Sequence, residues 1–419
     1  MAEPASPTES PLRASIALLL TRRFGTYWFA TLLSNIGYWV QEVAQPWLLL
    51  SLGASSFVIG LDAFMGDAPA WLLTLVGGVL ADRADRRRVI AGFQSIQMLC
   101  PILLIVLLAT GHIAPWIVVL TSLVVGTTDA LSMPSYQSIV PSIVEHSQIA
   151  SGIALSSTQF NVSRILGPAV AGLLIGGIGM LGCFAVNAAS YVPFIAVALW
   201  ILPRGRVARD PRDAFDLRHP FAGTREILRD RDLRSALLTV AATGLLCSPI
   251  VTFSPVLVRD VLHGSASDFS LTMAAFGVGG LLGAIGLLAV HTAADRRKIA
   301  RRFAVALGGV VCGCAVAPSL WLLPILVFLA GMTMTISNTS LNAFIQSTAP
   351  GHLRGRIVSL YMLAMRGGMA LGSIATGLMI DLSGVRTGLL VDGALAVVVH
   401  LVLARTWANG RPVATKIDE

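Results

Sequence analysis

Ionisable side chains lie inside long apolar stretches of this sequence, where hydrocarbon surroundings would make them energetically expensive. The carboxylates are Glu42, Asp62, Asp67 and Asp129, and the cations are Arg164 and Arg366. A low-dielectric cavity disfavours the charged form of a carboxylate, which can bring protonation into the working pH range. A proton gradient could then drive a conformational change. The pattern therefore predicts Glu42, Asp67 and Asp129 as candidates for proton coupling.

Position along each stretch separates these candidates. Glu42 lies well inside its stretch and is the first choice, whereas Asp62 lies near an end, where we expect water to hydrate it. A structural ion pair or a polar cavity lining is the alternative for each carboxylate. Arg164 could pair with a carboxylate or extend to the membrane surface. Arg366 could do the same, or attract an anionic substrate.

A compact basic segment, Gly78–Ile90, joins two apolar stretches and reads G-V-L-A-D-R-A-D-R-R-R-V-I. Gly78 lets neighbouring backbones approach closely, and Asp82 places a carboxylate at a helix end. The arginines hold this loop at one membrane face; they are Arg83, Arg86, Arg87 and Arg88. A similar cluster returns at 294–299, roughly 210 residues later, which suggests an internal repeat.

Composition places the chain in a lipid bilayer. Of its 419 residues, 55% are hydrophobic and only 12% are charged, which is far too apolar for an ordinary soluble domain. The net charge of +8 could suggest nucleic acid, but the basic residues lie between apolar stretches instead of forming a face. We therefore interpret them as topology signals and expect no nucleic-acid partner.

Residue patterns for catalysis are missing from the sequence. It has no nucleophile–base pair, no metal-ligand spacing and no glycine-rich phosphate loop before a soluble helix. A membrane-embedded enzyme acting on lipids is therefore disfavoured, and we expect no cofactor and no metal.

Hydrophobic windows of about 20 residues indicate roughly twelve transmembrane helices and an all-α integral membrane fold. The expected spans are 25–50, 57–81, 89–110, 113–133, 150–177, 180–202, 235–258, 269–291, 303–317, 320–341, 357–381 and 386–405. The predicted divisions are a tail at 1–23, a six-helix bundle at 24–202, a linker at 203–234, a second six-helix bundle at 235–405 and a tail at 406–419. Within the linker, 221–233 could form a helix at the membrane surface or remain solvated.

Two further motifs recur in the same order as the basic loops. Gln137-Ser138-x-x-Pro141 returns as Gln346-Ser347-x-x-Pro350, and the Leu-Gly-x-x-x-x-Gly-Leu-x-Ile pattern of 166–175 returns at 371–380. Ordered recurrence predicts two pseudo-symmetric halves with a binding site between them, as in transporters.

Charge asymmetry predicts the orientation. If the N-terminus is cytoplasmic, every Lys and Arg falls in a cytoplasmic loop or tail except Arg164, Arg259, Arg366 and Arg386. Both termini are therefore expected in the cytoplasm.

The motifs of this sequence resemble those of the major facilitator superfamily. Gly78–Ile90 matches that superfamily's loop 2–3 signature along its length, except that Asp85 stands at the second glycine position. Within the superfamily, the chain resembles the bacterial transmembrane secretion effector branch, which includes enterobactin exporters and macrolide efflux proteins. The stretches that carry this resemblance are Trp39–Gln41, Pro46–Trp47, Ala84–Arg88, Pro134, Pro141 and Arg164–Pro168.

The resemblance implies a conformational gate made of Gly78, Asp82, Arg83, Arg86 and Arg87. In the superfamily the aspartate at the Asp82 position meets the N-terminal end of a helix in the opposite half, here near Arg356. That contact exists only while the cytoplasmic side is closed, and Arg83 and Arg86 would add ion pairs to it. The alternative is that the arginines only set orientation.

A second motif bears on the direction of transport. Gly167-Pro168 with Gly172 resembles the signature of superfamily antiporters, which favours export. The alternative is a helix-packing and kink motif without bearing on direction. An arginine that many efflux relatives carry in their fourth span is absent here.

Together these features predict a proton-coupled exporter of small amphipathic compounds, drugs or siderophore-like metabolites, in a bacterial inner membrane. A proton-coupled importer of a nutrient is the main alternative, a channel is a minor one, and the superfamily implies a monomer. Aromatic, amide and methionine side chains could line the cavity, with lipid-facing or packing roles as the alternative. They are Tyr38, Trp39, Gln41, Gln45, Trp71, Gln159, Asn161, Asn338, Asn342, Met362 and Met365.

Overall fold

The protein is built from helices, and the ranges described below contain no strand. A computed structural model describes residues 17–71, 73, 76–77, 80, 84–145, 148–202, 224–288, 295–348 and 354–408. The apolar sequence forms long helices because a helix satisfies every backbone hydrogen bond within itself.

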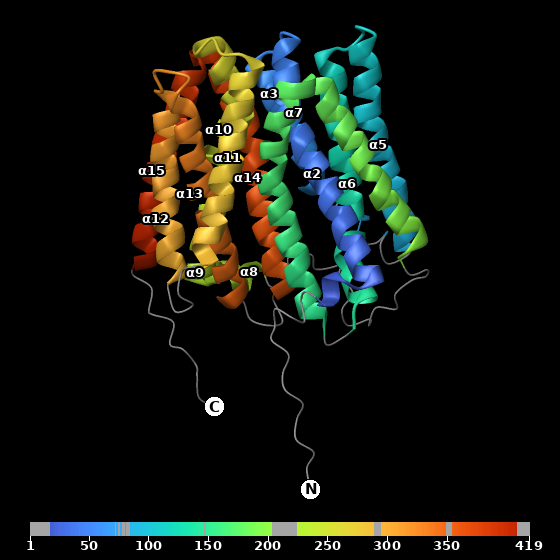
Figure 1. Ribbon diagram of the computed structural model, residues 1–419. Coiled ribbons are helices and arrows are strands. Elements are labelled where there is room, and N and C mark those ends of the chain that lie inside the picture. Colours follow the sequence, from blue (N-terminus) through green and yellow to red (C-terminus); the bar gives the residue numbers. More distant parts are fainter. Residues whose placement is uncertain are drawn as a thin grey trace.

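The first helix group comes from the first half of the chain. It contains α2 (Arg22–Ser51), α3 (Ser56–Asp67), α5 (Arg86–Ala109), α6 (Pro115–Ile143) and α7 (Ile149–Trp200). Helix α7 is interrupted at Gly179, where φ is 72°, a conformation that glycine adopts without penalty. The two parts of α7 run in opposite directions on either side of that turn, so α7 holds two of the predicted spans (Figure 1).

The second helix group comes from the second half of the chain. It contains α8 (Thr224–Arg229), α9 (Arg231–Leu246), α10 (Pro249–Val256), the π-helical turn η3 (Leu257–Val261), α11 (Ala266–Leu288), α12 (Arg296–Ala315), α13 (Leu322–Thr348), α14 (Arg354–Ser383) and α15 (Val385–Ala408). In the described ranges, eight helical segments are long and apolar enough to cross a membrane. The all-α membrane fold is thus confirmed, while the count of twelve spans and the domain limits stay predictions.

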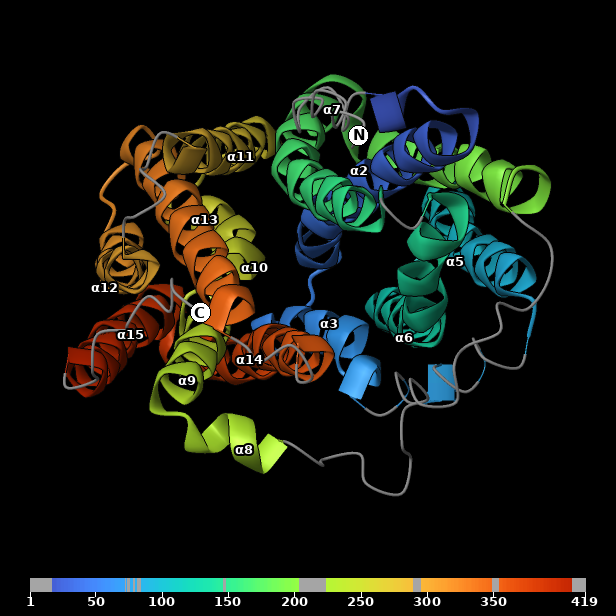
Figure 2. The same cartoon turned by 90° about the horizontal axis from the view of Figure 1, so that it is seen from below.

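The two groups meet along two pairs of helices. Seen along the helix axes, α2, α5, α6 and α7 lie on one side and α9 to α15 on the other (Figure 2). Helix α3 packs against α14, and α11 packs against α7. We call the end of the molecule where α2 begins and α15 ends the terminal end, and the other the opposite end (Figure 1).

Equivalent aspartates cap the N-terminus of one helix in each group. Asp85 caps α5 by accepting a hydrogen bond from the backbone amide of Arg87 at 3.1 Å. Asp295 caps α12 by accepting one from the amide of Arg297 at 3.0 Å. An aspartate at this position stabilises a helix by about 1 kcal/mol. Asp85, which departs from the glycine of the superfamily signature, therefore has a local structural role that the second basic cluster repeats.

Candidate functional site

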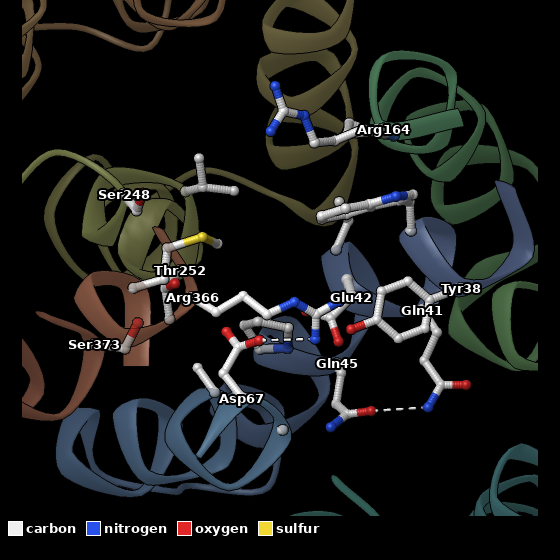
Figure 3. Close-up of a pocket in the computed structure, with 18 of the residues that line it drawn as sticks. Tyr38, Gln41, Glu42, Gln45, Asp67, Arg164, Ser248, Thr252, Arg366 and Ser373 are labelled. Atoms are coloured by element: carbon white, nitrogen blue, oxygen red, sulfur yellow. Dashed lines mark hydrogen bonds and ion pairs between the residues drawn. The ribbon is translucent and has the colours of Figure 1, made fainter. Parts of the chain in front are cut away.

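A cavity lies between the two helix groups, and many of the predicted site residues line it (Figure 3). Those that line it are Tyr38, Trp39, Gln41, Glu42, Gln45, Asp67, Arg164, Pro168, Asn338, Met365 and Arg366. They come from α2, α3 and α7 of the first group and from α13 and α14 of the second. A cavity shared by both groups is the place where a ligand could influence how they pack together.

Arg366 ties the two groups together by ion pairs. Its Nη1 atom on α14 lies 3.0 Å from Asp129 Oδ2 on α6 and 3.5 Å from Asp67 Oδ1 on α3. The three side chains are largely buried, between 19% and 31% exposed. Two carboxylates therefore compensate one guanidinium at the boundary between the groups. Charged side chains have to point away from lipid, which brings these three together inside the protein.

Glu42 lies beside this ion-paired cluster without joining it. Its side chain is exposed to the cavity, one helical turn after Tyr38 on the same face of α2. It interacts electrostatically with Arg366 and Asp67, but among the described residues it forms no ion pair. Glu42 is thus a carboxylate whose charge can respond to events in the cavity.

Asp62 belongs to a separate buried network within the first group. Gln45 Nε2 donates to both Asp62 oxygens at 3.0 and 2.8 Å, and Ser122 Oγ donates to Oδ1 at 2.7 Å. Gln41 Nε2 donates to Gln45 Oε1, and Asn187 Nδ2 donates to Gln41 Oε1, at 3.0 and 2.6 Å. Asp62 is only 5% exposed. The expectation that water hydrates Asp62 is therefore wrong, because neighbouring helices shield it laterally.

Comparison with known families agrees with this architecture. Residues 13–410 match the family described as transmembrane secretion effector. The chain belongs to that family. It is therefore a multi-pass membrane transporter of the major facilitator superfamily that handles small-molecule substrates, and it is not an enzyme.

Three curated relatives are similar over most of their length. The staphyloferrin A transporter of Staphylococcus aureus is 24% identical over 402 residues, covering 94% of this chain and 98% of the relative. The multidrug efflux pump Tap of Mycolicibacterium fortuitum is 25% identical, covering 85% and 88%. Macrolide efflux protein A of Streptococcus pyogenes is 22% identical, covering 91% and 95%.

Solved transporter structures share the fold. The nucleoside transporter NupG superposes with a TM-score of 0.71 at 11% identity, covering 92% of this chain and all of that one. At such low identity this likeness bears on the fold alone. It supports the major facilitator architecture for this transporter.

Two glycines of the transporter's α7 motif mark close helix contacts. A Cβ atom on Gly167 would lie 2.2 Å from Cβ of Trp39 on α2. A Cβ atom on Gly172 would lie 2.5 Å from the backbone oxygen of Ser270 on α11. Glycine thus lets α7 approach α2 within its own group and α11 in the other, while Pro168 between them lines the cavity.

The predicted gate is only partly described by the structure. Gly78, Asp82 and Arg83 lie outside the described residues. Arg86 donates to the backbone oxygen of Ser138 on α6 at 3.5 Å, and Arg87 donates to that of Leu199 on α7 at 2.8 Å. These contacts lie within the first group, so the gating role of both arginines stays a prediction.

Four of the predicted cavity residues do not line it, and a fifth cannot be placed. Gln159 is 3% exposed and its Nε2 has no hydrogen-bond partner in the described parts. Asn342 accepts from Gln346, Met362 packs against a buried cluster around Tyr361, and Trp71 lies against Gly367. The side chain of Asn161 is outside what the structure describes.

Sequence reasoning missed two buried ionisable groups of α15. Asp392 is 4% exposed and accepts a hydrogen bond from Thr376 Oγ1 on α14 at 2.7 Å. His400 is 1% exposed, and its Nε2 lies 3.2 Å from Thr243 Oγ1 on α9. A carboxylate inside an apolar stretch was the available signal for Asp392. Neither residue lines the cavity, and each bonds to another helix of the second group.

Several contacts join the groups at the opposite end of the molecule. Arg259 Nη1 of η3 donates to the backbone oxygen of Leu50 on α2 at 2.5 Å. Trp47 of α2 stacks on Phe269 of α11, with ring centroids 5.0 Å apart. Asp381 near the end of α14 accepts from the first backbone amide of α3, that of Ser56, at 2.8 Å. Polar and aromatic contacts thus join the two groups at this end.

Proposed function

We propose that this transporter is a proton-coupled exporter of small amphipathic compounds that works by alternating access between its two helix groups. The observation that carries the proposal is the pairing of Arg366 with Asp67 and Asp129 beside Glu42. These groups meet where α14 of one helix group faces α3 and α6 of the other.

Proton exchange at these carboxylates would act on the packing of the groups. A proton on Asp67 or Asp129 removes one attraction between Arg366 and the first group. Glu42 interacts electrostatically with the same guanidinium. Once Glu42 has lost its proton, its negative charge compensates part of the positive charge of Arg366. A proton can therefore change the relative stability of two arrangements, which is the requirement for coupling.

The substrate class follows from the cavity lining and from the relatives. Trp39 and Phe160 of the first group and Met365 and Met369 of the second present aromatic and thioether surfaces to the cavity. Such side chains accommodate bulky apolar bodies of irregular shape. The printed functions of the relatives, drug efflux, macrolide efflux and siderophore transport, agree with amphipathic substrates.

Orientation and gating complete the proposal. We place both termini in the cytoplasm of a bacterial cell, because alternating spans then put nearly all basic residues in cytoplasmic loops and tails. Asp82 would close this end by meeting the start of α14. The transporter would act as a monomer, since its cavity is formed within one chain.

Lumenal pH in inverted, acid-loaded membrane vesicles tests the proposal. Siderophores, macrolides and lipophilic cations are added singly to vesicles that contain the transporter or its Glu42→Gln variant. Proton antiport predicts lumenal alkalinisation with at least one compound and its loss in Glu42→Gln. Glu145→Gln is the matched control, because Glu145 is exposed outside the helices and should leave the signal unchanged.

Other outcomes would contradict the proposal in distinct ways. Further acidification on addition of a compound would indicate symport and favour the importer. The lack of any pH response, with folded protein in the vesicles, would contradict proton coupling. Alkalinisation that persists in Glu42→Gln would move the coupling role to Asp67 or Asp129.

A further inference from the structure

Arg164 is a cation of the cavity that the coupling scheme does not use. It lies on α7, is partly buried and faces the cavity. Within the described parts of the chain it makes no hydrogen bond and no ion pair, whereas Arg366 pairs with two carboxylates. Figure 3 shows Arg164 at one edge of the cavity, apart from the cluster of Asp67, Glu42 and Arg366.

Charge is segregated within the cavity. All carboxylates among its lining residues belong to α2 and α3, and they are Glu42, Asp62 and Asp67. Among the described residues, those of the second group that line the cavity include no carboxylate. The ionisable group of that half that acts on Arg164 is the phenol of Tyr361 on α14. Within the described part of the chain, the wall formed by that group therefore offers Arg164 no carboxylate.

Both helix groups contribute apolar side chains to the cavity that Arg164 lines. Phe160 lies one helical turn earlier on α7 and packs edge-on against Trp39, with ring centroids 6.4 Å apart. The second group presents Phe276 of α11 and Met334 of α13 to the same cavity. A ligand held at Arg164 would thus have space for a flat or bulky apolar body.

An uncompensated guanidinium at membrane depth is costly, and an anion would remove that cost. The planar guanidinium fork matches a carboxylate with two parallel hydrogen bonds. We propose that Arg164 is the residue of this cavity that recognises the substrate's charge, and that the substrate is an amphipathic anion. Its carboxylate binds Arg164 and its apolar body lies against Phe276 and Met334. This inference rests on the proposed function, in that the cavity is taken to hold the substrate.

Arg366 is not the anion site on this view. Its guanidinium already faces Asp129 at 3.0 Å and Asp67 at 3.5 Å, and a third anion there would meet repulsion from both. The two arginines therefore divide two tasks: Arg366 joins the helix groups, and Arg164 is free to bind a ligand.

Binding of three matched probes tests the inference without requiring transport. Pyrenebutanoate, pyrenebutanamide and pyrenebutylammonium share one aromatic body and differ in charge. Binding to the full-length transporter in nanodiscs is measured by calorimetry, with empty nanodiscs as the blank. We expect the butanoate to bind about tenfold or more tightly than the butanamide, the gain expected of hydrogen bonds to a charged group.

Variants assign that preference to one residue. In Arg164→Gln the ratio of the two affinities should fall to about one, while the affinity for the butanamide stays unchanged and so reports an intact cavity. Arg164→Lys should keep part of the preference because it keeps the charge. Arg229→Gln removes an exposed arginine of α8 and should leave the ratio as in the unmodified protein.

Three results would overturn the inference: equal affinities in the unmodified protein, tighter binding of the ammonium probe, or a carboxylate preference that survives Arg164→Gln. Failure of all three probes to bind folded protein would also overturn it, because the cavity would then not take amphipathic anions. A carboxylate preference that depends on Arg164, together with a silent vesicle assay, would leave this inference standing and contradict proton-coupled export instead.

Discussion

Asp381 accepts hydrogen bonds from the backbone amides of Ser56 at 2.8 Å and Phe57 at 3.0 Å, so the end of α14 caps the start of α3. The carboxylate meets the positive end of a helix that belongs to the other group. The predicted gate is the reverse arrangement: Asp82, which follows α3, is expected to meet the start of α14 at the terminal end. One pair of antiparallel helices would then carry a latch at each end.

Removing the Asp381 carboxylate should loosen the opposite end of the transporter. Asp381→Ala leaves two amides of α3 without their acceptor, at a cost of about 1 kcal/mol, a roughly fivefold change in population. Spin labels at the exposed loop positions Thr110 and Trp321, one in each helix group, should then show a larger share of long distances. Ser383→Ala is the control, since Ser383 bonds only within α14 among the described contacts. An unchanged distance distribution in Asp381→Ala would show that this cap does not hold the end closed.

The Arg366 ion pairs should show an order of strength. In double-mutant cycles on thermal unfolding, Arg366→Gln with Asp129→Asn should give a larger coupling free energy than Arg366→Gln with Asp67→Asn. The reason is the shorter distance, 3.0 Å against 3.5 Å. Coupling energies for contacting residues lie at about 0.5 to 3 kcal/mol. Additive effects for both pairs would argue that water in the cavity screens these charges.

Glycine contacts in α7 predict opposite effects for the same substitution. Gly167→Ala places a methyl group against Trp39 and should lower stability by about 1 to 3 kcal/mol through overpacking. Gly176→Ala in the same helix has nothing within 4 Å and should be neutral or stabilising by up to about 1 kcal/mol. Thermal unfolding of both variants in one detergent measures the difference. Equal melting temperatures would mean that α7 and α2 can separate without loss.

The sequence was sufficient to predict the helical architecture, because a spanning helix shows itself as a run of consecutive apolar residues. It was also sufficient to direct most intramembrane charges to the cavity, since Glu42, Asp67 and Arg366 have to avoid lipid. Which charges pair was not predictable, because Asp129 and Arg366 are 237 residues apart and meet only through packing. The contact between Asp381 and Ser56 spans 325 residues and was missed for the same reason.

The rotation of each helix about its own axis was the other feature that the sequence did not predict. Met362 and Met365 lie on one helix and were predicted alike, and both pack against the buried cluster around Tyr361, yet only Met365 of the two lines the cavity. Asp62 was misjudged because its position along α3 gives depth, whereas its burial depends on Gln45 and Ser122 of adjacent helices. The local sequence specifies neither the rotation of a helix nor the residues of adjacent helices that will surround it.

Replacing each carboxylate by its amide should distinguish the role of Asp62 from that of Glu42. All described hydrogen bonds of Asp62 come from Gln45 and Ser122 in its own helix group, so none of them crosses the boundary. Asp62→Asn should therefore keep substrate-dependent alkalinisation in the vesicle assay, whereas Glu42→Gln should lose it. Gln45→Ala should lower stability by about 1 to 3 kcal/mol, because it leaves a buried carboxylate with fewer donors. A vesicle signal that Asp62→Asn abolishes and Glu42→Gln keeps would transfer the coupling role to Asp62 and its buried network.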